Sequence, residues 1–180
     1  MKKYIKPIVV MLAIILACGG LLAILSDLLF VSTEERINRA IGKIYTEETV
    51  TLEKTIDVTT IDMTDLATYG EIKACYELSN GDLLILSRGK KGYSNGTVTT
   101  YVAIDNTLTV KKVVQDSYTA QTLMSKLTGI YDEYEDMDSA TDKSEFDGVI
   151  VSGATYSSKA VSNSVYVAVK FAERLERLGG

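Results

Sequence analysis

The stretch that decides the fold lies near the C-terminus and reads Val149-Ile150-Val151-Ser152-Gly153-Ala154-Thr155-Tyr156-Ser157-Ser158-Lys159-Ala160-Val161. Its first three residues are apolar and β-branched, which favours a buried strand. A helix is expected to begin near Ser157 or Ser158 and to run to about Leu178, because apolar residues recur there at helical spacing. The small residues Ser152 to Thr155 are therefore predicted to form a strand-to-helix turn.

Such a turn can hold a phosphate group. The backbone N–H groups at the start of a helix are unpaired, and the helix dipole favours negative charge there. Gly153 and Ala154 leave room for a bulky group to approach. The same small residues are also common in ordinary turns and helix caps, so a purely structural role stays open.

The box Ser152-Gly153-Ala154-Thr155, followed by Ser157-Ser158-Lys159-Ala160-Val161, resembles the flavinylation motif of the FMN-binding domain family. That family includes the G subunit of Rnf electron-transport complexes and the C subunit of sodium-pumping NADH:quinone reductases. The resemblance implies that Thr155 carries FMN through a phosphoester bond, installed by a flavin transferase that uses FAD. It also implies an electron-carrying subunit of an Rnf-like ion-translocating complex, which acts with other membrane subunits rather than as an enzyme on its own.

The resemblance places the cofactor-binding residues around this turn; they are Thr155, the point of covalent attachment, and Ser152, Gly153, Ala154, Tyr156, Ser157 and Ser158. The serine hydroxyls and the amides at the start of the helix are expected near the phosphate. Tyr156 could pack on the flavin, and Tyr93 and Tyr118 are further candidates of the same kind. Neither a catalytic residue nor a metal ligand is assigned.

Two other functions fit the same sequence. One is a stand-alone extracytoplasmic flavin carrier that serves extracellular electron transfer. The other is an anchored binding domain that has kept the fold and lost the flavin. Flavin that stays with the denatured polypeptide would distinguish the last possibility from the first two.

The composition excludes several classes of protein. A net charge of -5 over 180 residues argues against a nucleic-acid partner, because phosphate binding needs a concentrated basic face. The absence of histidine excludes a Ser-His-Asp triad and a histidine-liganded zinc site. Cys18 and Cys75 cannot build an iron–sulfur cluster, so redox chemistry would require a bound organic cofactor.

The N-terminal region indicates a membrane anchor. Lys2, Lys3 and Lys6 precede an uncharged run from Ile8 to Leu25, which is about the length of a helix that crosses a bilayer. The lysines favour a cytoplasmic N-terminus, so we expect a single-pass protein of the cell membrane whose C-terminal domain is extracytoplasmic. A cleaved signal peptide and lipidation of Cys18 are the alternatives.

The remaining pattern predicts an α+β fold, in which the N-terminal transmembrane helix precedes one domain with a mainly antiparallel sheet and packed helices. The expected divisions are 1–31 for the membrane segment, 32–46 for a helical stalk and 47–180 for the FMN-binding domain. Strands are expected within 46–60 and at 71–78, 82–87, 97–104 and 107–115, with a hairpin turn at Asn80-Gly81. A glycine-rich loop covers 89–96, a helix is expected at 118–134, and the acidic segment 132–147 is predicted to be a solvated linker.

Overall fold

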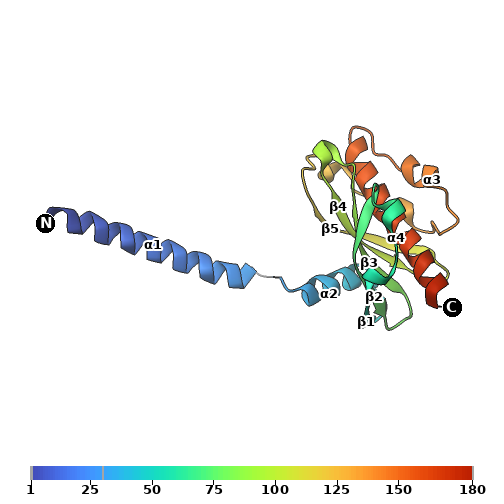
Figure 1. Cartoon of the computed structure of the whole chain (residues 1–180), viewed down its shortest axis with the longest axis horizontal. Helices are drawn as coiled ribbons and strands as arrows, with labels where there is room; N and C mark the ends of the chain where they lie inside the picture. The colour runs from blue at the N-terminus through green and yellow to red at the C-terminus, as the bar shows by residue number, and fades with distance from the viewer. Residues whose placement is uncertain (1, 30, 180) are drawn as a thin grey trace. The chain divides into compact units, whose positions relative to one another are not determined.

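The computed structural model describes residues 2–29 and 31–179; inside the first helix it describes the side chains of 8–22 and 25. The chain divides into two compact units, Met1–Arg36 and Ile37–Gly180. Helix α1 (Lys2–Leu29) lies in the first unit, and α2 (Thr33–Ile44) begins there and continues into the second (Figure 1). The second unit contains the sheet and the remaining helices.

The apolar side chains described in α1 are exposed, among them Ile8, Leu16 and Leu22. In the part of the chain that the structure describes, no helix is both long and apolar enough to cross a membrane. The expected transmembrane segment is therefore not confirmed, and its residues 23 and 24 have side chains outside the described set. Cys18 lies on α1 as an exposed thiol.

A five-stranded antiparallel sheet forms the centre of the second unit, which confirms the predicted α+β class. Its strands follow one another in sequence order as a meander of β1 (Leu52–Ile56), β2 (Gly70–Leu78), β3 (Leu83–Gly89), β4 (Val98–Ile104) and β5 (Val110–Tyr118). The predicted hairpin turn lies between β2 and β3, where Gly81 has a φ of +84° and its N–H donates to Leu78 O at 2.8 Å. Glycine adopts this left-handed conformation without steric cost.

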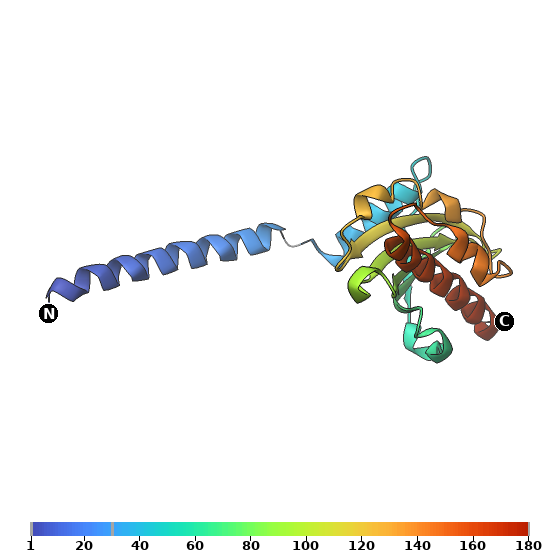
Figure 2. The same ribbon diagram turned by 90° about the horizontal axis from the view of Figure 1, so that it is seen from above.

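The two faces of the sheet are covered by different helices, as Figure 2 shows from above. Helix α4 (Thr155–Gly179) lies across β2, β3 and β4, and its buried residues Val161, Val165 and Phe171 belong to the larger core cluster. The other face contacts α2, whose Ile37 and Ile41 pack in a smaller cluster. Successive side chains of a strand point to opposite faces of the sheet. The short helix α2 therefore packs on one face and the long helix α4 on the other.

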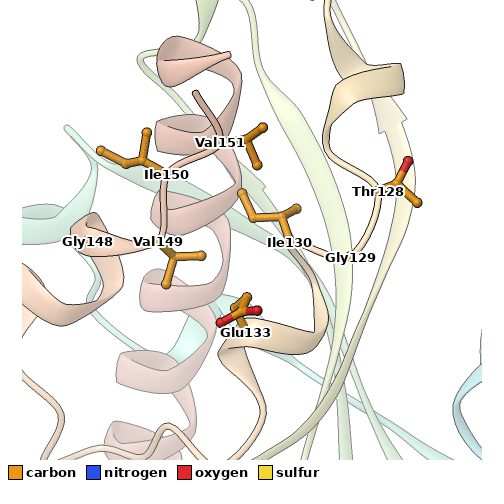
Figure 3. A pocket seen from close by; sticks show the side chains of 8 residues that line it. All are labelled: Thr128, Gly129, Ile130, Glu133, Gly148, Val149, Ile150 and Val151. Carbon is orange, nitrogen blue, oxygen red and sulfur yellow. The ribbon is translucent and has the colours of Figure 1, made fainter. Parts of the chain in front are cut away.

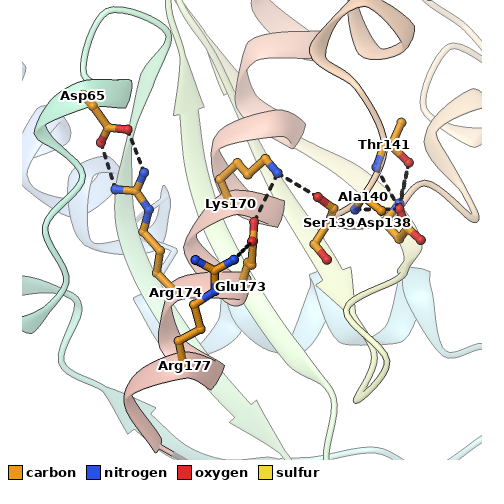
Figure 4. Close-up of polar contacts among 9 residues, drawn as sticks. All are labelled: Asp65, Asp138, Ser139, Ala140, Thr141, Lys170, Glu173, Arg174 and Arg177. Atoms are coloured by element: carbon orange, nitrogen blue, oxygen red, sulfur yellow. Dashed lines mark hydrogen bonds and ion pairs between the residues drawn. The ribbon is translucent and has the colours of Figure 1, made fainter.

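Polar contacts fix the C-terminal half of α4 to neighbouring loops (Figure 4). The guanidinium of Arg174 donates to both carboxylate oxygens of Asp65, at 2.8 and 2.7 Å. Four residues earlier, the Lys170 ammonium donates to Ser139 O at 2.7 Å. These contacts therefore hold the C-terminal half of α4 to loops on both sides.

The predicted helix at 118–134 is wrong. Strand β5 continues to Tyr118, and two 3₁₀ turns, Met124–Lys126 and Asp132–Tyr134, follow it. Ala120 and Gly129 have φ values of +53° and +86°, which interrupt any continuous helix. Of the predicted apolar face, Leu127 and Ile130 are buried, whereas Leu123 is 36% exposed and Tyr131 is half-buried, and short turns rather than a helix position them.

The predicted strand at 149–151 is also wrong. This segment has no strand neighbour, and the side chain of Ile150 is 51% exposed. Instead of a strand hydrogen bond, the Val151 N–H donates to the hydroxyl of Ser158 at 3.0 Å. The segment therefore enters α4 directly from a loop that follows helix α3 (Lys143–Gly148).

The acidic segment 132–147 packs more closely than a solvated linker. Its backbone pairs with the start of β5, because Asp136 N–H donates to Val110 O and Val110 N–H donates to Met137 O. Tyr134 and Phe146 are fully buried and stacked. Within the described ranges, no group of three or more acidic or thiol side chains could hold a metal ion. The acids therefore flank a packed segment of the core.

Candidate functional site

The turn before α4 is tight and depends on one glycine. Gly153 has a φ of +78°, and the N–H of Ala154 donates to Val151 O at 2.9 Å. A side chain with Cβ is strained in this conformation, so glycine is favoured at this position. The helix begins at Thr155, slightly earlier than the sequence pattern predicted.

The first turn of α4 presents unpaired donors. The first amide that bonds back along the helix is that of Ser158, which donates to Ala154 O at 2.9 Å. In the described part of the chain, the N–H groups of Thr155, Tyr156 and Ser157 take part in none of the backbone hydrogen bonds. Thr155 is exposed and Tyr156 is 64% exposed, so a group attached to the threonine hydroxyl would lie beside free donors.

The serines of the predicted site divide into two kinds. Ser152 is exposed at the turn, whereas Ser157 and Ser158 are buried. The Ser158 hydroxyl donates to Ala154 O at 3.1 Å, and the Ser157 hydroxyl donates to Gln121 Oε1 at 2.8 Å. The two buried hydroxyls therefore stabilise the turn from inside, while Ser152 and Thr155 face the outside.

A pocket of about 330 Å³ opens beside Thr155. Three segments that are distant in sequence line it: Tyr93 from the glycine-rich loop, Thr122 and Leu123 after β5, and Gly153, Ala154, Thr155, Tyr156 and Ser157 at the start of α4. Tyr93 thus lines the same pocket as Thr155. Tyr118 is not among the lining residues; it ends β5 and is 47% exposed.

A second pocket, of about 430 Å³, is formed by residues that follow β5 and residues that precede α4 (Figure 3). Its walls are the segments 128–130 and 148–151, with Glu133 at one end. Ile130 and Val151 approach each other across it, while Ile150 points away to the exterior.

Two lysines that sequence reasoning did not assign lie near the turn. The Lys126 ammonium would be 3.5 Å from a Cβ at Gly153, so its charge lies against the glycine of the box. Lys159 is exposed one helical turn after Thr155, and residues four apart share a face of a helix. The spacing of Lys159 could have been noticed in the sequence; the approach of Lys126 depends on the tertiary fold.

More positive charge lies along the same side of α4. Burial lowers the pKa of Lys143, the nearby Asp147 carboxylate opposes that shift, and the charges of Lys159 and Lys91 lower it further. The Lys143 ammonium also pairs with Asp147 and lies over the Tyr166 ring. The Lys143 charge is thus balanced by Asp147 beside the middle of α4, and the two lysines at the turn itself, Lys126 and Lys159, suit an anionic ligand.

One comparison with known proteins gives a match. The family model described as FMN-binding domain matches residues 92–170, a segment that contains both the Tyr93 loop and the Thr155 turn. Neither the comparison with curated proteins nor the comparison with solved structures returned a match. The matched segment ends inside α4. It includes all the residues that line the pocket beside Thr155.

Proposed function

We propose, from the premise that residues 92–170 belong to the FMN-binding domain family, that this protein is a flavoprotein with FMN attached to Thr155 through a phosphoester bond. One observation carries the proposal: Thr155 is exposed at the first residue of α4, with a 330 Å³ pocket beside it. Attachment there needs an accessible hydroxyl, and a pocket is needed for the rest of the cofactor.

The residues present fit such a group. The amides of Thr155, Tyr156 and Ser157 are free to donate to phosphate oxygens, and the helix dipole adds to the attraction. Lys126 and Lys159 supply positive charge on two sides. Tyr93 and Tyr156 provide aromatic surface for a planar ring system.

The attachment step is a phosphoryl transfer to the threonine. Oγ1 of Thr155 would form a new bond to the phosphorus on the FMN side of FAD. The pyrophosphate bond would break, AMP would leave, and the hydroxyl proton would pass to a base of the transferase. The chain's own contribution is to hold the hydroxyl in an accessible position on a rigid helix.

Bound FMN supplies one- and two-electron redox chemistry. The residues of this chain would retain and orient it, because covalent attachment keeps the cofactor at a high local concentration even in a dilute compartment. We therefore propose electron relay as the role. The partners would be other membrane subunits of an Rnf-like ion-translocating complex, and a flavin transferase during maturation.

The location that we propose rests on the sequence alone. The uncharged run from Ile8 to Leu25 after three lysines supports a single-pass anchor in the cell membrane, with an extracytoplasmic C-terminal domain. Extraction of membranes with alkaline carbonate tests the anchor, and protease protection of intact cells tests the orientation. Release of the full chain into the carbonate supernatant would contradict the proposal.

Covalent flavin is tested on protein that is produced together with an active flavin transferase. Intact-mass spectrometry should show the polypeptide plus one FMN less one water, and the denatured band should fluoresce in a gel. Thr155→Val should remove both signals, whereas Thr55→Val, which removes an exposed threonine hydroxyl on β1 outside the matched segment, should retain them. Detection of only the bare polypeptide mass in the parent chain would refute the proposal.

A stand-alone flavin carrier is the second candidate. The match covers a domain and identifies no neighbouring subunit, which leaves a carrier without partners consistent with the same site. Affinity purification from membranes distinguishes the two roles. A stable complex with other membrane subunits supports the Rnf-like assignment, and a flavinylated chain that purifies alone supports the carrier.

A further inference from the structure

A buried glutamine connects the segments that form the pocket beside Thr155. Gln121 is 6% exposed, and its Oε1 accepts from two donors: the Ser157 hydroxyl at 2.8 Å and the Tyr93 N–H at 3.2 Å. Its Nε2 donates to Thr119 O at 3.2 Å. One side-chain amide thus joins the glycine-rich loop, the end of β5 and the first turn of α4.

The glycine-rich loop is shaped around this amide. A Cβ at Gly92 would lie 2.2 Å from Gln121 Nε2, and a Cβ at Gly96 would lie 2.5 Å from the same atom. Side chains at either position would displace the glutamine. The loop is closed by its own hydrogen bonds, since Gly92 N–H donates to Gly96 O and Gly96 N–H donates to Tyr93 O. Its Tyr93 end is therefore held to α4 through Gln121, while its other end is held by Asn163 of α4, whose Nδ2 donates to Lys90 O at 2.9 Å.

We propose that Gln121 is a positioning residue that holds the Tyr93 loop and the first turn of α4 at a fixed separation, so that the pocket between them is formed before any ligand binds. The proposal rests on the proposed function in one respect, namely that the group held in this pocket is the FMN attached to Thr155. Gln121 itself lies behind Ser157 and acts through it and through the Tyr93 loop.

The physical reason is the cost of an unpaired buried group. Without the amide, the part-buried Tyr93 N–H and the buried Ser157 hydroxyl would each lose an acceptor. The Tyr93 loop would then adopt other conformations in addition to its present one. A pocket with a movable wall holds a planar group in several orientations, and a fixed wall holds it in one.

The first experiment tests the connection without flavin. Hydrogen exchange is measured on the Thr155→Val chain with and without Gln121→Leu. Loss of the bond to Tyr93 should raise the exchange rates of the Tyr93 and Gly96 amides on the order of tenfold. Gln115→Leu is the matched control, because Gln115 also accepts a side-chain hydrogen bond, from the Tyr131 hydroxyl at 2.8 Å, and does not line the pocket.

The second experiment measures the attached flavin in the flavinylated chain. Gln121→Leu should lower the fluorescence anisotropy of the flavin and change its emission, while intact mass shows that attachment persists. Ser157→Ala should shift the anisotropy in the same direction by a smaller amount. A role in stability alone would not produce this signature, since Gln115→Leu should leave the flavin signal unchanged.

The outcomes separate this inference from the proposed function. Unchanged exchange at residues 92–96 in Gln121→Leu would overturn the connection. Faster exchange with a flavin anisotropy equal to that of the Gln115→Leu control would overturn the positioning role. If the parent chain carries no flavin, the proposed function fails, and the exchange measurement still decides whether Gln121 holds the loop to α4. If Gln121→Leu does not fold, Ser157→Ala provides both readouts.

Discussion

The hydroxyl groups of Ser87, on β3, and Ser164, on α4, lie 2.8 Å apart in the core, and both side chains are fully buried. Ser164 also donates to Ser87 O at 2.9 Å and contacts the Thr100 hydroxyl at 2.9 Å. This buried polar cluster fixes the register of α4 on the sheet. The position of Thr155 at the start of the helix follows from it.

We expect Ser164→Ala to lower the free energy of unfolding by about 1–3 kcal/mol, because it leaves the hydroxyls of Ser87 and Thr100 with fewer partners in a dry core. Urea titration of the full chain measures the change. The control is Thr128→Ala, which removes an exposed hydroxyl that donates to Ser125 O, and it should stay within about 0.5 kcal/mol. Equal effects for both variants would contradict the prediction.

We expect Gly89→Ala to be far more damaging. A Cβ at Gly89 would lie 1.9 Å from Ala160 O and 2.5 Å from Ser164 N, so the strand and the helix would have to separate. The free energy of unfolding should fall by about 3 kcal/mol or more, and flavin loading should fall with it. Gly148→Ala is the matched control, since a Cβ there meets no atom within 4 Å. A stable, loaded Gly89→Ala protein would show that α4 can shift freely.

The sequence patterns predicted the sheet well for a physical reason. The turn Asn80-Gly81 joins β2 directly to β3, so local information determines both strands and their pairing. The segment 118–134 differs. Its apolar spacing correctly indicated the buried Leu127 and Ile130, but the backbone at Ala120 and Gly129 is left-handed, and the spacing of side chains does not report that.

The candidate site, too, could be predicted from local sequence only in part. The box from Ser152 to Thr155 could be read locally, because a turn and the helix it starts are contiguous. Gln121 lies 36 positions before Ser157, and only the folded chain brings the two together. Lys126 reaches Gly153 in the same way. A resemblance based on a short box therefore predicts a point of attachment, while the residues behind the pocket require the tertiary structure.

Cys75 provides a probe of the core that is independent of flavin. It is fully buried on β2, and burial raises the pKa of its thiol to about 12. At pH 8 the native thiolate fraction is then only about one part in ten thousand, whereas an unfolded cysteine ionises near pH 8.5. In a Cys18→Ser chain, a maleimide should therefore label Cys75 only when urea unfolds the domain. Rapid labelling of the native protein would contradict the burial.

Lys126 should contribute to phosphate binding at the turn. In the Thr155→Val chain, where attachment is blocked, Lys126→Gln should raise the Kd for free FMN about three- to tenfold, because one partly solvated charge pair is lost. Riboflavin, which lacks the phosphate, should bind both proteins equally in isothermal titration. Lys54→Gln, on the exposed strand β1, removes the same charge far from the turn and serves as the control. Equal losses for riboflavin and FMN would show that Lys126 supports the pocket itself rather than the phosphate, and equal losses for Lys54→Gln would reduce the effect to net charge.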